Sequence, residues 1–231
     1  MREEYKSEGK CLFCGKTFAK AGITRHMSMH LQDVVKTGQS GQSFFVKVEL
    51  PKRWGPAPFF LSLWIDGETT LSTLDKFLRD IWLECCGHMS AFRISKSKEI
   101  PMSRKVNQVF KKGVVVDYEY DFGSTTELSI TVVEEYPVKA DKKIVLLSRN
   151  EPIQAMCATC NKEAATQICT VCSYKAYSMF CDKCAKKHAK TCEDFDDYAS
   201  MPVVNSPRMG VCGYTGGSID VERDGVYQVS N

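Results

Sequence analysis

The sequence lacks any long apolar run. No segment approaches the roughly 20 residues that a helix needs to cross a bilayer, and the N-terminal residues lack the apolar core of a secretory signal peptide. We therefore expect a cytoplasmic protein with no membrane partner. An excess of one charge is also absent: the formal net charge is +3 and 26% of the residues are charged, so composition alone does not require a nucleic-acid partner.

Motifs that mark common enzyme classes are missing too. The chain has no glycine-rich phosphate-binding loop, no nucleophile elbow and no His-Glu-x-x-His motif. It has no internal repeat beyond its cysteine pairs and no low-complexity tract. These absences favour a protein without enzymatic activity, and the sequence assigns no catalytic residue and no organic cofactor.

Two groups of residues nevertheless leave some chemistry open. Asp117, Glu119 and Asp121 alternate along a predicted strand, so their carboxylates would share one face and could hold Mg²⁺ for phosphoryl chemistry. Such a row is more often the solvent face of a sheet. A nucleophile–base pair could form within a second group, which follows a predicted helix: Cys85, Cys86 and His88. Cysteines at a helix end mostly behave as small hydrophobic residues.

The chain is, by contrast, rich in cysteine. There are 12 cysteines, and eight of them form four Cys-x-x-Cys pairs: Cys11/Cys14, Cys157/Cys160, Cys169/Cys172 and Cys181/Cys184. Two thiolates separated by two residues on a tight turn can reach one tetrahedral zinc ion. In a reducing cytoplasm such clusters bind metal more often than they form disulfides. The sequence therefore predicts zinc sites.

The first pair opens a segment that resembles a C2H2 zinc finger. His26 and His30 lie four residues apart on a predicted helix, so they would share one face and one ion with Cys11 and Cys14. The side chains available for nucleic-acid contacts are Lys20, Thr24 and Arg25. Because phosphate neutralisation scales with the number of contacts, a lone finger with so few basic side chains should bind duplex DNA weakly. We favour a structural or protein-docking finger.

The remaining pairs belong to one module. Residues 157–192 read C-x2-C-x8-C-x2-C-x8-C-x2-C-x3-H-x3-C, which supplies ligands for two further zinc ions, so that three ions are expected in all. The order resembles that of B-box fingers, in which the two sites interleave. That resemblance implies one ion on Cys157, Cys160, Cys181 and Cys184, and another on Cys169, Cys172, His188 and Cys192. Spacing alone does not exclude a sequential assignment. Either way, every ligand position is filled and none is left for a catalytic water.

The end of this module predicts a helix with a basic stripe. The zinc ligands fall on one arc, and four lysines fall on the opposite arc: Lys183, Lys186, Lys187 and Lys190. The stripe could contact an acidic partner or phosphates, although a solvated face next to the acidic residues that follow is the ordinary interpretation.

Between the zinc segments, the chain has the pattern of an α+β domain. Positions 44, 46, 48 and 50 are apolar and alternate with Phe45, Lys47 and Glu49, as in a half-buried strand. Residues 59–65, 114–120 and 127–134 predict further strands, and residues 69–84 have helical spacing. The predicted fold class is α+β, with a small mixed sheet, a helix packed on one face and two small zinc-stabilised modules.

The same pattern predicts the division of the chain. We expect a finger at 1–34, a linker at 35–43, an α+β core at 44–150, a double zinc module at 151–198 and a C-terminal segment at 199–231 that closes on the core.

Three blocks in the middle of the chain share a known pattern. They are the strand and helix of LSLWIDGETTLSTLDKFL, then His88, Met89 and Phe92, and later Tyr118, Tyr120, Asp121, Phe122 and Gly123. With residues 210–214, these blocks resemble the Ri-plasmid open-reading-frame-three family, also labelled insertion-element passenger, TnpR-like. Residues 124–128 replace the family's Asp-x-Trp-x-His, so no activity of that loop is carried over. The resemblance implies that the double zinc module is an insertion in the core.

Together these patterns favour a prokaryotic zinc-binding adaptor or regulator that contacts a protein or nucleic-acid partner through its finger modules. Two alternatives stay open. One is a Mg²⁺-dependent nucleic-acid enzyme or recombination accessory of mobile-element origin, and the other is a single-finger DNA-binding protein. The sequence does not name the partner or the oligomeric state.

Overall fold

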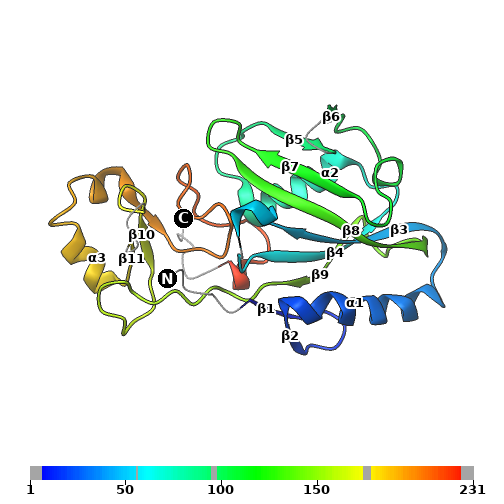
Figure 1. Ribbon diagram of the computed structural model, residues 1–231, viewed down its shortest axis with the longest axis horizontal. Helices are drawn as coiled ribbons and strands as arrows, with labels where there is room; N and C mark the ends of the chain where they lie inside the picture. Colours follow the sequence, from blue (N-terminus) through cyan, green and yellow to red (C-terminus); the bar gives the residue numbers. More distant parts are fainter. Residues whose placement is uncertain (1–6, 56, 95–97, 174–177, 225–231) are drawn as a thin grey trace. The chain divides into compact units, whose positions relative to one another are not determined.

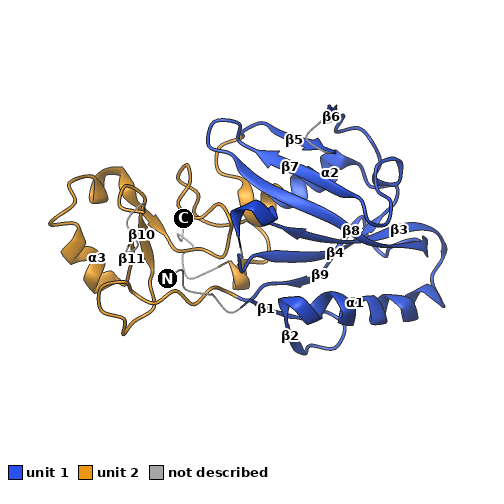
Figure 2. Ribbon diagram, viewed as in Figure 1, with its two compact units in different colours: residues 1–78, 88–151 blue, residues 79–87, 152–231 orange. Residues whose placement is uncertain are grey.

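The structure is a computed structural model that describes residues 7–55, 57–94, 98–173 and 178–224 (Figure 1). Its chain divides into two compact units (Figure 2). The first comprises residues 1–78 and 88–151, and the second comprises residues 79–87 and 152–231. The outer ends of the predicted finger and of the predicted C-terminal segment lie outside the described residues.

The first unit is built on a seven-stranded sheet with the order β6-β5-β7-β8-β3-β4-β9, and every neighbouring pair is antiparallel. The strands are β3 (Ser40–Glu49), β4 (Phe60–Asp66), β5 (Ser90–Arg93), β6 (Glu99–Ile100), β7 (Val115–Tyr120), β8 (Thr126–Val138) and β9 (Ile144–Arg149). The α+β class predicted from the sequence is confirmed. Strands β5, β6 and β9 were not predicted, because β5 and β6 are too short to show a clear period and β9, with the sequence IVLLSR, does not alternate.

Helix α2 (Leu71–Leu78) packs on one face of this sheet. Thr70 Oγ1 accepts the backbone N–H of Thr73 at 3.2 Å and so caps the first turn. Asp75 Oδ1 accepts hydrogen bonds from the hydroxyls of Ser90 on β5, at 2.5 Å, and Tyr118 on β7, at 2.7 Å. A helix was predicted over residues 69–84. In the structure the α-helix ends at Leu78, and a π-helical turn follows at Arg79–Leu83. No helix in the described part of the chain is both long and apolar enough to cross a membrane.

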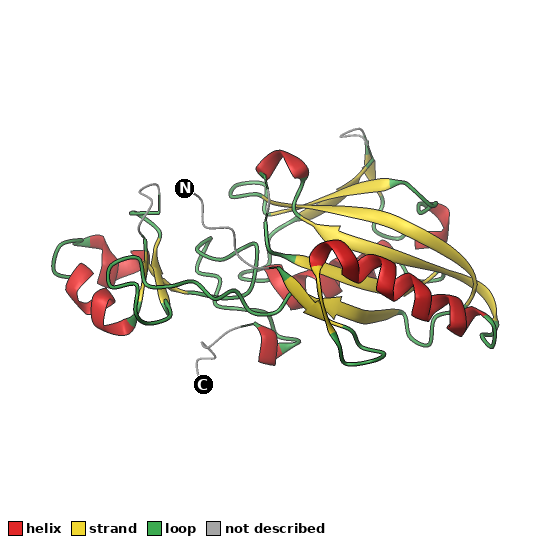
Figure 3. Cartoon of the chain, turned by 60° about the horizontal axis from the view of Figure 1, so that its bottom comes forward, coloured by secondary structure: helices red, strands yellow, loops and turns green. Residues whose placement is uncertain are grey.

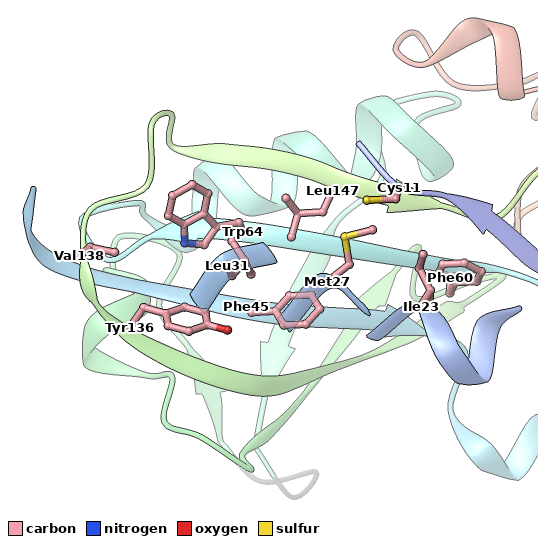
Figure 4. Close-up of a cluster of buried hydrophobic side chains, with 10 residues drawn as sticks. All are labelled: Cys11, Ile23, Met27, Leu31, Phe45, Phe60, Trp64, Tyr136, Val138 and Leu147. Atoms are coloured by element: carbon pink, nitrogen blue, oxygen red, sulfur yellow. The ribbon is translucent and has the colours of Figure 1, made fainter. Parts of the chain in front are cut away.

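Helix α1 (Lys20–Val35), the helix of the predicted finger, covers the other face of the sheet (Figure 3). Ile23, Met27 and Leu31 lie four residues apart and are fully buried. They join a core with side chains from β3, β4, β8 and β9 (Figure 4), which are Phe45, Phe60, Trp64, Tyr136, Val138 and Leu147. Phe45 was expected on the half-exposed face, and that expectation is wrong because helix α1 covers it.

The finger and the sheet therefore form one unit, and the predicted division at residues 35–43 does not separate them. Helix α1 runs to Val35, and β3 already begins at Ser40, which leaves little of the expected linker. Burial of each large apolar side chain contributes about 1.5–3 kcal/mol. Three such side chains on one helix give the finger a far larger core than its own residues could make.

A hairpin of β1 (Glu8–Lys10) and β2 (Thr17–Ala19) precedes helix α1 and is tied to β9. The N–H of Leu12 donates to the carbonyl of Leu147 at 2.9 Å, and Gly9 bridges to Asn150. A Cβ at Gly9 would come within 2.6 Å of the Phe60 ring and the Ser148 hydroxyl. Only glycine allows the hairpin to approach the sheet this closely.

The second unit holds a three-stranded antiparallel sheet with the order β11-β10-β12. Its elements are β10 (Gln167–Cys169), β11 (Met179–Phe180), α3 (Asp182–His188), a π-helical turn (Phe195–Ala199) and β12 (Ser200–Pro202). Its small core consists largely of cysteines with the rings of Phe180 and Phe195. Such a core buries too little apolar surface to be stable alone, which is typical of metal-stabilised modules.

The C-terminal segment packs on residues 79–87, which belong to the same unit. Ser206 Oγ donates to the carbonyl of Trp82 at 2.6 Å, and the N–H of Ser218 donates to the carbonyl of Asp80 at 2.7 Å. A Cβ at Gly217 would lie 2.4 Å from the carbonyl oxygen of Ile81. The segment therefore closes on the end of the helix that the sequence analysis had placed in the core.

We predict that Met27→Ala lowers the free energy of unfolding of the first unit by about 2–5 kcal/mol, because it leaves a cavity between helix α1 and the sheet. Met29→Ala is the matched control, since Met29 lies on the same helix and is 57% exposed. Urea denaturation followed by fluorescence measures both. Equal, small effects of the two substitutions would show that helix α1 does not pack on the sheet.

Candidate metal centres

The finger residues converge on one point. Cys14 Sγ lies 3.2 Å from His26 Nε2, and His26 Nε2 lies 3.2 Å from His30 Nε2. Cys11 completes the group, in which all four ligand atoms lie within 4.8 Å of one another. The set of two cysteines and two histidines is one that structural zinc sites use. The structure thus brings together the four residues that the sequence predicted for this site.

Local backbone geometry places these ligands. The N–H of Gly15 donates to the carbonyl of Cys11 at 2.9 Å, and Gly15 has a φ of 69°, a left-handed conformation that suits glycine. This turn brings both thiols to the same side of the hairpin. His26 and His30 are one helical turn apart, so their rings project from the same face of α1.

Aromatic packing and burial keep the imidazoles suited to metal binding. Phe18 stacks on His26 with ring centroids 3.9 Å apart, and Phe13 stacks on His30 at 5.0 Å. Burial, together with the nearby His30, lowers the pKa of His26 below its usual value. The neutral imidazole, which is the form that binds metal, is therefore favoured at neutral pH.

The side chains predicted for nucleic-acid contacts are not equally available. Lys20 Nζ lies 2.9 Å from Glu49 Oε1 and donates to the carbonyl of Ala57 at 2.9 Å. Burial alone would raise the pKa of Glu49, but hydrogen bonds from Lys47 and Lys20 hold that pKa below its usual value. Thr24 is half-buried, and Arg25 is exposed. Lys20 is thus engaged inside the first unit, and its role as a nucleic-acid contact stays a prediction.

The C-terminal module contains two groups of ligands, and their members alternate along the chain. The first comprises Cys157, Cys160, Cys181 and Cys184, and the second comprises Cys169, Cys172, His188 and Cys192. Cys160 Sγ lies 3.9 Å from Cys181 Sγ, and Cys169 Sγ lies 3.9 Å from Cys192 Sγ. In a tetrahedron with Zn–S bonds of about 2.3 Å, sulfur atoms are roughly 3.8 Å apart. The arrangement is the interleaved one, and its spacing fits zinc.

A buried ring nitrogen of His188 independently supports a metal site here. Its Nε2 is buried and has no hydrogen-bond partner in the structure. The ring is held by Phe180, which stacks on it at 4.4 Å, and by the edge of Phe195 at 5.1 Å. A buried polar atom without a partner costs about 1–3 kcal/mol. A metal ion on this nitrogen would remove that cost.

A cation would also stabilise the thiols of the first group. Burial opposes ionisation of Cys157, yet backbone N–H groups that point at its sulfur, those of Cys181 and Cys160 first, lower its pKa to about 6. Burial and the neighbouring thiols, Cys157 above all, raise the pKa of Cys184 to about 12. Several adjacent thiolates therefore repel one another, and a divalent ion would stabilise all of them at once.

The four lysines of the basic stripe are exposed. Lys183 Nζ lies 2.9 Å from Glu163 Oε1, and this pair is exposed, so it contributes little to stability. Lys186, Lys187 and Lys190 are exposed on or just after α3 (Asp182–His188).

The acidic row does not form a cation site. Asp121 has a φ of 64°, and its Oδ1 accepts the N–H groups of Gly123 at 3.0 Å and Ser124 at 3.2 Å, so it leaves the strand and closes a turn. Glu119 Oε2 lies 3.4 Å from Arg93 Nε. Among the described residues, no metal-binding group contains Asp117, Glu119 or Asp121. The shared face predicted for the three carboxylates is therefore wrong, because the strand ends at Tyr120.

A fourth group contains a residue that the sequence analysis missed. Cys85, Cys86 and His88 are joined by Cys212, with all ligand atoms within 4.8 Å of one another. Hydrogen bonding with Cys212 and Cys85, followed by burial, raises the pKa of Cys86 to about 12, which argues against a reactive thiolate. Counting could have found Cys212, since it is the one cysteine that no predicted group includes. All 12 cysteines are free of disulfides.

Comparisons with known proteins add little. No protein-family model matches the sequence, and no curated protein matches it. A similar solved structure is that of a protein of unknown function, MM3350, from Methanosarcina mazei Go1. It is 14% identical, and the match covers 50% of this chain and 71% of that chain with a TM-score of 0.38. A TM-score this low carries no inference.

We predict that paired substitutions will separate interleaved from sequential ligation. Cys160→Ser with Cys184→Ser should remove one ion, because both residues belong to the same group, whereas Cys160→Ser with Cys172→Ser should remove two. Native mass spectrometry of the zinc-loaded chain counts the ions.

Val171→Ser is the control for these variants, since Val171 lies beside Cys172, is 41% exposed and belongs to no ligand group. It should keep every ion. The opposite result, two ions lost from the first pair and one from the second, would establish sequential ligation.

Proposed function

We propose that the protein is a zinc-dependent adaptor of the cytoplasm, where its 12 thiols stay reduced. The support comes from the donor sets: each group offers four protein ligands, so a bound zinc ion would be fully coordinated and would leave no position for a substrate or a catalytic water. Zinc at the finger and at the two sites of the C-terminal module would supply folding energy.

We infer that the partner is a protein, and the observation that carries this inference is the use of helix α1. One face of that helix holds two ligands, and another is buried against the sheet through Ile23, Met27 and Leu31. Lys20, the first residue of the helix, is paired with Glu49. A helix in the major groove needs several exposed side chains near its start, and here Arg25 is the basic side chain that the described helix still exposes.

The C-terminal module offers the better docking surface. Lys186, Lys187 and Lys190 are exposed near α3, and Tyr198 is 63% exposed on the π-helical turn that follows. Tyrosine is enriched at protein interfaces, and complementary charges at the rim of an interface guide association. A partner with an acidic segment fits this surface. The resemblance to the plasmid open-reading-frame-three family remains a prediction about the sheet.

The adaptor proposal predicts no salt-sensitive binding to nucleic acid. Fluorescence anisotropy with mixed duplex DNA, single-stranded DNA and RNA at two salt concentrations measures it. The zinc-loaded protein should behave like the variant with Lys186→Ala, Lys187→Ala and Lys190→Ala, and like Arg25→Ala, because none of these side chains contacts phosphates. If the protein binds nucleic acid, and this binding weakens with salt and is lost in either variant, the choice of a protein partner is overturned. The adaptor proposal itself is overturned if the protein nicks plasmid with Mg²⁺ and Asp117→Asn abolishes the nicking.

The docking surface can be tested directly with a photo-cross-linking amino acid at position 187. We expect a discrete cross-linked partner in cells, and we expect it to disappear when Cys172→Ser removes a ligand and disorders the module. A cross-linker at position 89 is the control, since Met89 is 73% exposed in the first unit. Identical cross-links from both positions would show that α3 is not the docking surface.

A further inference from the structure

The cysteines and histidines of this chain, which are the side chains that zinc prefers, fall into four groups. The sequence contains 12 cysteines and four histidines. After the finger and the two interleaved groups have taken theirs, the residues left over are Cys85, Cys86, His88 and Cys212, and these four form a group themselves. No cysteine and no histidine of the chain lies outside a group of four. Chance proximity would leave some of them unassigned.

We propose that Cys85, Cys86, His88 and Cys212 hold a fourth zinc ion. Cys86 Sγ lies 3.7 Å from Cys85 Sγ and 3.7 Å from Cys212 Sγ. These distances match the edge of roughly 3.8 Å expected between sulfur atoms bound to one zinc ion. They are also close to the 3.9 Å separations within the two groups of the C-terminal module.

The fourth ligand is close to the thiols along the chain itself. His88 is separated from Cys86 by a single glycine, which keeps its ring within reach of the same ion. Its Nε2 lies 3.5 Å from Asp121 Oδ2. A carboxylate beside the imidazole is common at metal-binding histidines, because it fixes the orientation of the ring.

The backbone after these cysteines has a positive φ, as it does after two of the four Cys-x-x-Cys pairs. In the finger and in the C-terminal module, the second cysteine of the first pair is followed by a residue with positive φ, Gly15 at 69° and Asn161 at 49°. Cys86 and Cys212 are likewise followed by Gly87 at 78° and Gly213 at 66°. Cys212 itself also has a positive φ, 51°. Turns of this kind can point backbone N–H groups towards an anion, such as a thiolate.

A buried cation balances the charge of the site. Three thiolates, a neutral imidazole and a divalent zinc ion carry one net negative charge. Arg208 is fully buried, and its Nη2 donates to Cys85 Sγ at 3.4 Å. A guanidinium at this distance stabilises thiolate ligands, and the ion pair in turn compensates the burial of the arginine.

The fourth zinc ion would act as a cross-link. It joins Cys85 and Cys86 to Cys212. Cys86 and Cys212 lie 126 positions apart along the chain. The three cysteines belong to the second unit, so their shared ion would hold the C-terminal segment on residues 79–87. This role is independent of the adaptor proposal.

The test is the number of zinc ions on the full chain, purified without oxygen and counted by native mass spectrometry. We expect four ions on the unmodified protein, and three on both Cys212→Ser and the variant that combines Cys86→Ser with Cys212→Ser, because the two residues share one ion. Met89→Ser is the matched control, since Met89 lies beside His88 and is 73% exposed. It should keep four ions.

A second measurement keeps the outcome decisive. Cobalt substitution of the same variants reports thiolate ligation through its charge-transfer absorption, which should fall when Cys212→Ser is introduced. Three ions on the unmodified protein with no change on Cys212→Ser would overturn the fourth site. A disulfide between Cys86 and Cys212 in peptide maps of the oxygen-free protein would overturn it as well. Cys172→Ser, which removes an ion from a different group, shows whether a failure concerns this site alone.

Discussion

The clustering of thiols and imidazoles in small cores is the constraint on which the structure depends. In the second unit, cysteines take the places that leucine or valine would fill in a larger domain, and the apolar area buried around them is small. Burial and the neighbouring thiols raise the pKa of Cys184, and a buried nitrogen of His188 has no hydrogen-bond partner. A divalent ion would resolve both problems, and its binding would then be coupled to the folding of this unit.

The first unit combines metal binding with ordinary packing in a single helix. Helix α1 presents His26 and His30 to the finger ligands, and the residues that follow each of them, Met27 and Leu31, to the sheet. The finger is thereby turned into the second layer of an α+β fold. This arrangement explains why β3 and β4 are buried on both sides although only one helix was expected to cover the sheet.

Charge pairing inside each unit decides which polar residues remain available for function. Lys20 is engaged by Glu49, and Glu119 is engaged by Arg93, so these side chains already have partners within the first unit. The exposed lysines near α3 keep their charge at the surface. Our proposal therefore places the docking surface on the C-terminal module, where these lysines are exposed.

The sequence by itself determined the α+β class, the main strands and the three predicted groups of metal ligands, because Cys-x-x-Cys spacing and strand alternation are local signals. Only the tertiary structure decided that helix α1 covers Phe45, that Asp121 leaves its strand and that Cys212 joins Cys85 and Cys86. Each of these depends on segments far apart along the chain. Local spacing can specify which residues bind a metal within a turn or a helix, but contacts over such separations are fixed by packing, which no short pattern encodes.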